Sequence, residues 1–223
     1  MSKENQDKEI ILATEKYLKE NFAGEATGHD WYHIRRVWNL SKSIADEEGD
    51  VDMFIVEMGA LLHDIADHKF HGGDETVGPQ RAAEYLNQYN IDEQSKQKIV
   101  QIVEEISFKG LGVTTIMSTK EGEIVQDADR LDAMGAIGVA RAFAYGGSKG
   151  RPIYDPLIKP VCHTSFAAYK TSTAPTLNHF YEKLLGLKDR LNTDTGRKEG
   201  ERRHAFMEDF LQNFYRDWDA SIR

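Results

Sequence analysis

Apolar residues recur at spacings of three and four positions along most of the chain, which is the period of an amphipathic helix. Strand-like alternation of apolar and polar residues is absent, and so are the Asn-Gly and Asp-Gly pairs that typically join the strands of a hairpin. The pattern therefore predicts an all-α protein whose helices bury their apolar faces against one another.

Capping residues suggest where the first helices begin and end. Apolar residues from Ile10 to Leu18 mark a first helix, which fades in a glycine-bearing stretch. Asp30 is placed to cap a second helix, which carries one apolar stripe and ends at Gly49. Asp52 is placed to cap a third helix over 53–62, and because this segment is apolar nearly all round we expect it to be the most buried helix.

The remaining sequence predicts further helices and one irregular segment. The helices are expected over 77–89, over 92–107 with Asp92 as the cap, as one or two helices in 121–147, and near 176–187 and 198–219. A long loop is expected near 146–174, which holds three of the five prolines. Long ordered loops in compact domains are usually lids or binding loops, and disorder is the alternative.

Composition narrows the class of protein. The 28 Lys and Arg against 37 Asp and Glu give a net charge of −9, which argues against binding to a nucleic-acid polymer. With 40% hydrophobic residues the 223-residue chain can bury a core, and a single domain is expected. Cys162 is the only cysteine, which excludes an intramolecular disulfide and a multi-thiolate zinc site. The polar start has no signal-peptide pattern, and no apolar run reaches the roughly 20 residues of a membrane span, so we expect a cytoplasmic protein without a membrane partner.

Four residues suggest a metal site, namely His33, His63, Asp64 and Asp129. His63 and Asp64 directly follow an apolar run, so they are carried toward the bundle interior, where unpaired polar groups cost several kcal/mol. Two imidazoles and two carboxylates would neutralise and bind one divalent cation, with Mn²⁺, Mg²⁺, Fe²⁺, Co²⁺ and Ni²⁺ as candidates. Four protein ligands leave about two positions of an octahedral ion for water and a substrate oxygen.

Asp67 is the candidate catalytic residue beside this site. It lies three residues after Asp64 and His68 lies four after it, so both share its helix face if the helix continues. Asp67 could act as general base or orient the nucleophilic water. The alternative is a helix-end carboxylate that merely holds Lys69 or His68.

The spacing of these motifs resembles a known family. His33, then the pair His63-Asp64, then Asp129 is similar to the H…HD…D signature of the HD-domain metal-dependent phosphohydrolase superfamily. The segments GHDWYHIRRVW, LLHDIADHKF, IVQDADRLDAMGAIGVARAFAYGG and GRPIYDP resemble its YedJ/YpgQ-like bacterial branch, and the likeness covers most of residues 28–215. The resemblance implies a single helical-bundle domain of the HD type over 1–223, with a metal-site core at about 28–145 and C-terminal helices at about 176–219.

The resemblance also implies that the four residues bind the metal and that the chain is a phosphohydrolase of phosphorylated small molecules, most of all nucleotides. The reaction would convert a nucleoside triphosphate to the monophosphate and pyrophosphate. Three alternatives stay open: a phosphodiesterase, a nucleoside monophosphate phosphatase, and a noncatalytic nucleotide-binding module. A homodimer is expected only from the general frequency of dimers.

A phosphorylated substrate requires positive charge close to the site. The candidate substrate-binding residues lie next to the motifs or in the predicted loop, and they are His68, Lys69, Lys109, Arg130, Lys149 and Arg151. For each cation the alternative is an exposed charge or a salt bridge, and for His68 it is a solvated loop histidine. Tyr154 could stack on a base or pack in the core.

Overall fold

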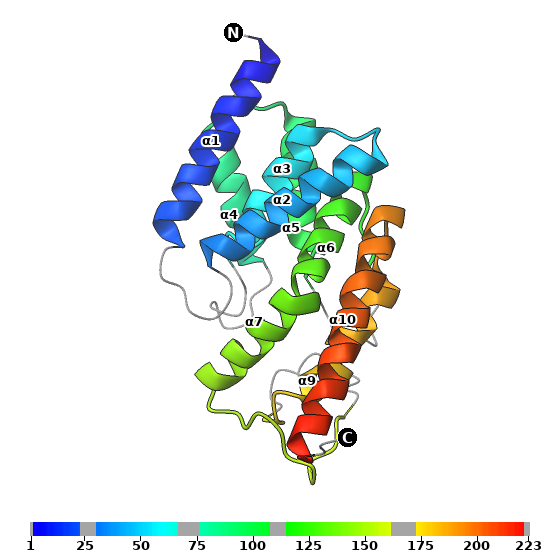
Figure 1. The fold of residues 1–223 in the computed structure, drawn as a ribbon. Coiled ribbons are helices and arrows are strands. Elements are labelled where there is room, and N and C mark those ends of the chain that lie inside the picture. Colours follow the sequence, from blue (N-terminus) through cyan, green and yellow to red (C-terminus); the bar gives the residue numbers. More distant parts are fainter. Residues whose placement is uncertain (1, 23–29, 67–75, 108–114, 162–172, 221–223) are drawn as a thin grey trace. The chain divides into compact units, whose positions relative to one another are not determined.

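In the computed structural model, which describes residues 2–22, 30–66, 76–107, 115–161 and 173–220, every regular element is a helix (Figure 1). The all-α class is therefore confirmed. None of the helices in these residues is long and apolar enough to cross a membrane. The chain divides into two compact units, one of 1–108 with 114–129 and one of 109–113 with 130–223. We describe the units separately, and a single domain over 1–223 stays a prediction.

The first unit consists of helices, three of which are capped at their N-termini by aspartates. Its elements are α1 (Lys3–Asn21), α2 (Trp31–Glu48), α3 (Met53–Leu62), α4 (Val77–Leu86), α5 (Glu93–Glu105) and most of α6 (Lys120–Asp132). The side chains of Asp30, Asp52 and Asp92 accept hydrogen bonds from backbone amides in the first turns of α2, α3 and α5. Since each cap satisfies amides that have no partner within the helix, the predicted starts of these three helices are confirmed.

Helix α3 lies at the centre of the first unit. It packs against α1, α2 and α5, and Val56, Met58, Leu61 and Leu62 are completely buried. A Cβ atom built on Gly59 would lie 3.0 Å from Ile102 of α5 and 3.6 Å from Val125 of α6, so the glycine allows three helices to meet closely. The expectation that this segment is deeply buried is confirmed.

The second unit contains the last turn of α6, α7 (Gly135–Ser148), α9 (Asn178–Glu182), the 3-10 helix η2 (Leu184–Arg190) and α10 (Asp194–Trp218). Phe143, Phe180 and Phe210 form an aromatic cluster between α7, α9 and α10, with ring centroids 5.6–6.0 Å apart. Aromatic packing of this kind supplies much of a small unit's buried apolar area.

Two boundaries in the second unit differ from the sequence-based expectation. The helix expected near 176–187 is divided into α9 and η2 because Lys183 adopts φ −145° and ψ −59°, outside helical values. The last helix begins at Asp194 rather than near 198, since the Thr193 hydroxyl caps it by accepting from the Gly196 amide at 2.9 Å. Gly200 allows this helix to pack closely on Leu191, because a Cβ at this position would lie only 2.2 Å from a methyl carbon of Leu191.

The segment expected as a long loop near 146–174 is irregular after α7 ends at Ser148, as far as 161 and again at 173–174. Residues 162–172 lie outside the described part of the chain. Tyr154 packs edge-on against Phe214, Tyr215 and Trp218 of α10, with ring centroids 5.1–5.9 Å apart. Tyr154 could stack on a nucleotide base or pack in the core, and these contacts are packing contacts.

Candidate metal centre

His33 is positioned by the first turn of α2. Its backbone N–H donates to the Asp30 carboxylate at 2.9 Å and so belongs to the helix cap itself. The His33 side chain is completely buried. The cap therefore fixes the point at which the α2 helix begins and with it the place of the imidazole.

His63 and Asp64 come directly after the last residue of α3. The Nδ1 atom of His63 lies 2.7 Å from the Ala60 carbonyl oxygen, so the Nδ1–H donates there and Nε2 keeps its lone pair in the neutral ring. The His63 side chain is 2% exposed and the Asp64 side chain 16% exposed. Two polar side chains are thus carried inward by the most apolar helix of the first unit, as the sequence predicts.

Asp129 reaches the same place through the packing of α6 on α3. Gly59 faces Val125, and one helical turn further along both helices His63 faces Asp129. The close approach at Gly59 therefore sets the register that brings a carboxylate of α6 to the end of α3. The Asp129 side chain remains 35% exposed.

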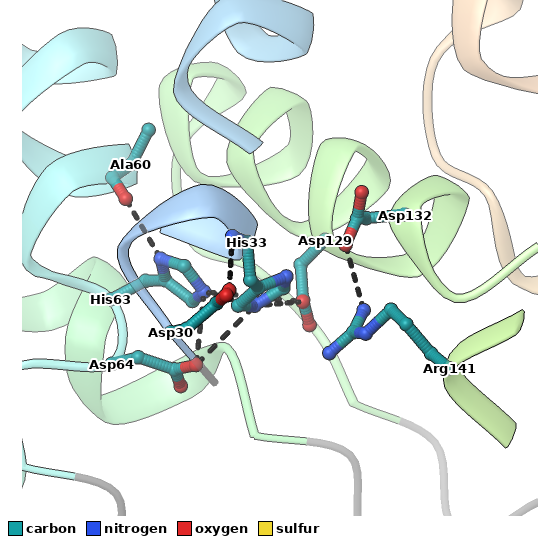
Figure 2. Close-up of polar contacts among 8 residues, drawn as sticks. All are labelled: Asp30, His33, Ala60, His63, Asp64, Asp129, Asp132 and Arg141. Atoms are coloured by element: carbon teal, nitrogen blue, oxygen red, sulfur yellow. Dashed lines mark hydrogen bonds and ion pairs between the residues drawn. The ribbon is translucent and has the colours of Figure 1, made fainter. Parts of the chain in front are cut away.

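The four side chains converge on one small volume, as Figure 2 shows. The two Nε2 atoms of His33 and His63 are 3.2 Å apart. An Asp64 oxygen lies 3.3 Å from the His33 Nε2 and 3.5 Å from the His63 Nε2. An Asp129 oxygen lies 3.5 Å and 3.9 Å from the same two nitrogens.

These separations suit a shared cation. Nitrogen and oxygen ligands lie about 2.0–2.2 Å from small divalent cations, so neighbouring ligands of an octahedral ion are about 3 Å apart. His33, His63 and Asp64, whose ligand atoms all lie within 4.8 Å of one another, form a group that could hold a metal ion. A single imidazole proton could satisfy only part of these contacts, whereas a cation would satisfy all of them.

Four of the other predicted site residues cannot be placed. Asp67, His68, Lys69 and Lys109 lie outside the described residues. The roles given to them, a catalytic role for Asp67 and substrate binding for the other three, stay predictions.

The three remaining predicted cations belong to the second unit. Arg130 is buried, and its guanidinium donates to the Arg190 carbonyl oxygen. The Lys149 amine and the Arg151 guanidinium each lie over the Tyr145 ring, at 5.6 and 5.7 Å from its centroid. Substrate contact by any of these three residues stays a prediction.

Two features of the site escaped the sequence analysis. The Ala60 carbonyl, which fixes the His63 tautomer, is three residues earlier in the same helix, and that spacing is the signal that could have identified it. Asp132, to which the sequence assigned no role, is paired with Arg141 at 2.7 Å (Figure 2). The Asp132 side chain is only 3% exposed. The two residues are not separated by a helical spacing, so no pattern in the sequence indicated the pair.

Comparison with known proteins agrees with this geometry. The HD domain family model matches residues 30–134, a span that contains all four converging side chains. The protein YpgQ of Bacillus subtilis is 38% identical over 204 residues, which are 90% of each chain. Among solved structures, an HD-superfamily hydrolase from Bacillus thuringiensis is 42% identical with a TM-score of 0.75, covering 96% of this chain and 100% of its own. Bacillus subtilis YpgQ in complex with ADP is 32% identical with a TM-score of 0.75, covering 95% of this chain and 96% of its own.

Fold and site define a class of protein: an all-α chain in which two buried histidines and a partly buried aspartate could hold a metal ion. Within that class, the chain belongs to the HD domain family and is related to the HD-superfamily hydrolases.

Proposed function

We propose that the chain is a divalent-metal-dependent phosphohydrolase that acts on phosphorylated small molecules. The observation that carries the proposal is the convergence of two imidazole nitrogens and two carboxylate oxygens, three of whose side chains are largely buried. In this proposal His33, His63, Asp64 and Asp129 hold the cation. Manganese, magnesium, iron, cobalt and nickel remain the candidates, because affinity alone does not select between them.

The preferred substrate class is a nucleotide. Support comes from the related YpgQ, which has been crystallised with ADP. We further propose cleavage of a nucleoside triphosphate to the monophosphate and pyrophosphate, as expected from the sequence resemblance. The net charge of −9 makes local cations necessary for binding a polyanion, and Lys69, Lys149 and Arg151 are the residues proposed for this.

The protein residues have separate tasks in this mechanism. A bound divalent cation would polarise a phosphoryl oxygen and lower the pKa of a water molecule. The Ala60 carbonyl holds the Nδ1–H of His63, which keeps the Nε2 lone pair directed at the site. The α2 cap holds His33 in place. Asp67 is proposed to accept or orient the proton of the attacking water.

The test is a product-resolved assay of the full chain, loaded in turn with each of the five metals. Nucleoside triphosphates, diphosphates, monophosphates and phosphodiesters are supplied, and pyrophosphate and orthophosphate are measured separately. We expect pyrophosphate from triphosphates, and at least about 100-fold slower turnover for Asp64→Asn. Asp46→Asn is the matched control, because Asp46 is an exposed carboxylate on α2, the helix of His33.

The other outcomes separate the alternatives. Orthophosphate from monophosphates would replace the pyrophosphohydrolase reaction by a phosphatase, and cleavage of diesters alone would replace it by a phosphodiesterase. If nucleotides bind in the presence of metal but no substrate is turned over, the chain is a nucleotide-binding module and the enzyme proposal is wrong.

A further inference from the structure

Two arginine side chains from other helices contact the last turn of α6. This turn begins directly after Asp129, the last residue of the first unit, and contains Leu131 and Asp132. The helix then stops, since Met134 is extended and Gly135 has φ +66°. A helix that ends this abruptly leaves carbonyl oxygens without partners inside the helix.

Arg203 of α10 adds a second hydrogen bond to the Leu131 carbonyl, which already accepts from the Met134 amide at 3.0 Å. Its Nη1 donates to the Leu131 carbonyl oxygen at 2.6 Å, and its Nε donates to Glu199 at 2.7 Å. Hydrogen bonds from Arg202 and Arg203 lower the pKa of Glu199 to about 2, so this carboxylate is charged near neutral pH. The aliphatic part of Arg203 packs on Gly135, where a Cβ would lie 3.1 Å from the Arg203 Cγ. The guanidinium is therefore fixed at both ends.

Arg141 of α7 holds the same turn through a side chain. Its Nη1 lies 2.7 Å from the Asp132 carboxylate, and the two side chains are 22% and 3% exposed. Because the pair is shielded from water, removing one member would leave the other charge buried without a partner charge, which is strongly destabilising. We refer to Arg141 and Arg203 together as the arginine clamp.

Asp129 is the least enclosed of the four proposed ligands, so the position of its carboxylate depends most on the helix backbone that carries it. Its side chain is the most exposed of the four, and its oxygen has the longest separation from a histidine nitrogen, 3.9 Å. It also lies outside the group of ligand atoms that are mutually within 4.8 Å. Asp132 follows Asp129 by one helical turn, so a shift or unwinding of this turn would move the Asp129 carboxylate.

We propose that the arginine clamp positions Asp129 for binding of the divalent cation, so that Arg141 and Arg203 act as positioning residues of the metal site. The inference rests on the proposed function, because it requires that the site bind a cation at all. It assigns a role in metal affinity to two residues that come from helices outside the first unit and that contribute no ligand atom to the four-residue cluster.

Electrostatics alone predicts the opposite change in cation affinity, so the sign of the change tests the proposal. Removing a positive side chain from a protein should strengthen the binding of a cation or leave it unchanged. The clamp predicts weaker binding, since the cost comes from a misplaced carboxylate and groups that orient ligands typically contribute about 10- to 100-fold in metal affinity.

The experiment measures Mn²⁺ affinity of the metal-free full chain by isothermal titration calorimetry and by electron paramagnetic resonance of free Mn²⁺. We expect Arg203→Met and Arg141→Met each to weaken binding by about 10-fold. Arg202→Met is the matched control, because Arg202 binds the same Glu199 from the same helix but is 69% exposed and its described hydrogen bonds go to Glu199 alone. The control should retain the affinity of the unchanged protein.

A double-mutant cycle tests whether the effect passes through Asp129. In an Asp129→Asn background, Arg203→Met should have no further effect on Mn²⁺ affinity, because the carboxylate that the clamp positions is already absent. An equal loss in both backgrounds, or no loss in either, overturns the clamp. If the unchanged protein binds no divalent cation, the proposed function fails instead, and the two failures are thereby distinguished.

Circular dichroism and thermal unfolding of the metal-free proteins separate positioning from misfolding. Arg203→Lys and Arg141→Lys are included, since a lysine keeps the charge and one donor. If the methionine variants do not fold, intermediate Mn²⁺ affinities of the folded lysine variants support the clamp, and unchanged affinities overturn it.

Discussion

Two histidine environments in this protein are surrounded by groups of opposite charge. In the first unit, the His33 and His63 nitrogens face the carboxylates of Asp64 and Asp129. In the second unit, His179 has Lys183 and Arg151 as its charged neighbours, and its burial together with these cations lowers its pKa to about 3. One environment attracts positive charge and the other repels it.

The difference shows how a metal-binding histidine can be separated from a structural one. Shielding from water does not decide, because His33 and His63 are buried and His179 is half-buried. Convergence with carboxylates decides, because negative charge favours a cation at the imidazole, whereas desolvation and neighbouring cations favour the neutral ring and oppose cation binding. Of the eight histidines in the sequence, the described residues place only His33 and His63 in a carboxylate-lined group that could hold a metal ion.

The largest expected effect comes from removing one histidine of the first environment. His63→Ala should weaken Mn²⁺ binding at least about 100-fold and abolish measurable hydrolysis, because it deletes a proposed ligand. His179→Gln should leave both properties unchanged. Calorimetric Mn²⁺ titration and the product assay measure these effects, and equal losses in the two variants would remove the distinction between the environments.

A second effect, of intermediate size, is the stabilisation of the fold by metal. At a free Mn²⁺ concentration 100 times its dissociation constant, the free energy of unfolding should rise by about 2.7 kcal/mol, since only the folded chain brings the four ligands together. Urea unfolding with Mn²⁺ and with a chelator measures the rise. The unchanged protein and His179→Gln should both show it. A similar rise in His63→Ala would mean that Mn²⁺ binds elsewhere.

The sequence predicted those parts of the fold that depend on local chemistry. A capping aspartate and the amides it binds are two or three residues apart, so the starts of α2, α3 and α5 were predicted correctly. The apolar surface of α3 likewise predicted its burial. The place of His63 and Asp64 at the end of that helix follows from the same local pattern.

Features that depend on distant contacts could not be predicted. The close packing of Gly200 on Leu191, nine residues earlier in the chain, is one such contact. Asp132 accepts a hydrogen bond from Arg141, which lies nine residues later, beyond the turn between α6 and α7. No helical period indicates a contact at that spacing. Arg130 is adjacent to a proposed ligand in sequence, yet it is buried and bonded to the Arg190 carbonyl.

The smallest expected effect concerns the pH dependence of stability in the second environment. The pKa of His179 is about 3 in the folded chain and about 6.5 in an unfolded one, so below pH 6.5 only the unfolded chain takes up the proton. This contribution to stability is complete above pH 6.5 and is lost progressively as the pH falls toward 3. Between pH 7 and pH 5, the metal-free protein should therefore lose about 1 to 2 kcal/mol more stability than His179→Gln. Urea unfolding of both proteins at each pH measures the difference, in which groups common to the two proteins cancel. Identical pH profiles would show that burial and the cationic neighbours do not hold His179 neutral, and the contrast with His33 and His63 would then rest on the carboxylates alone.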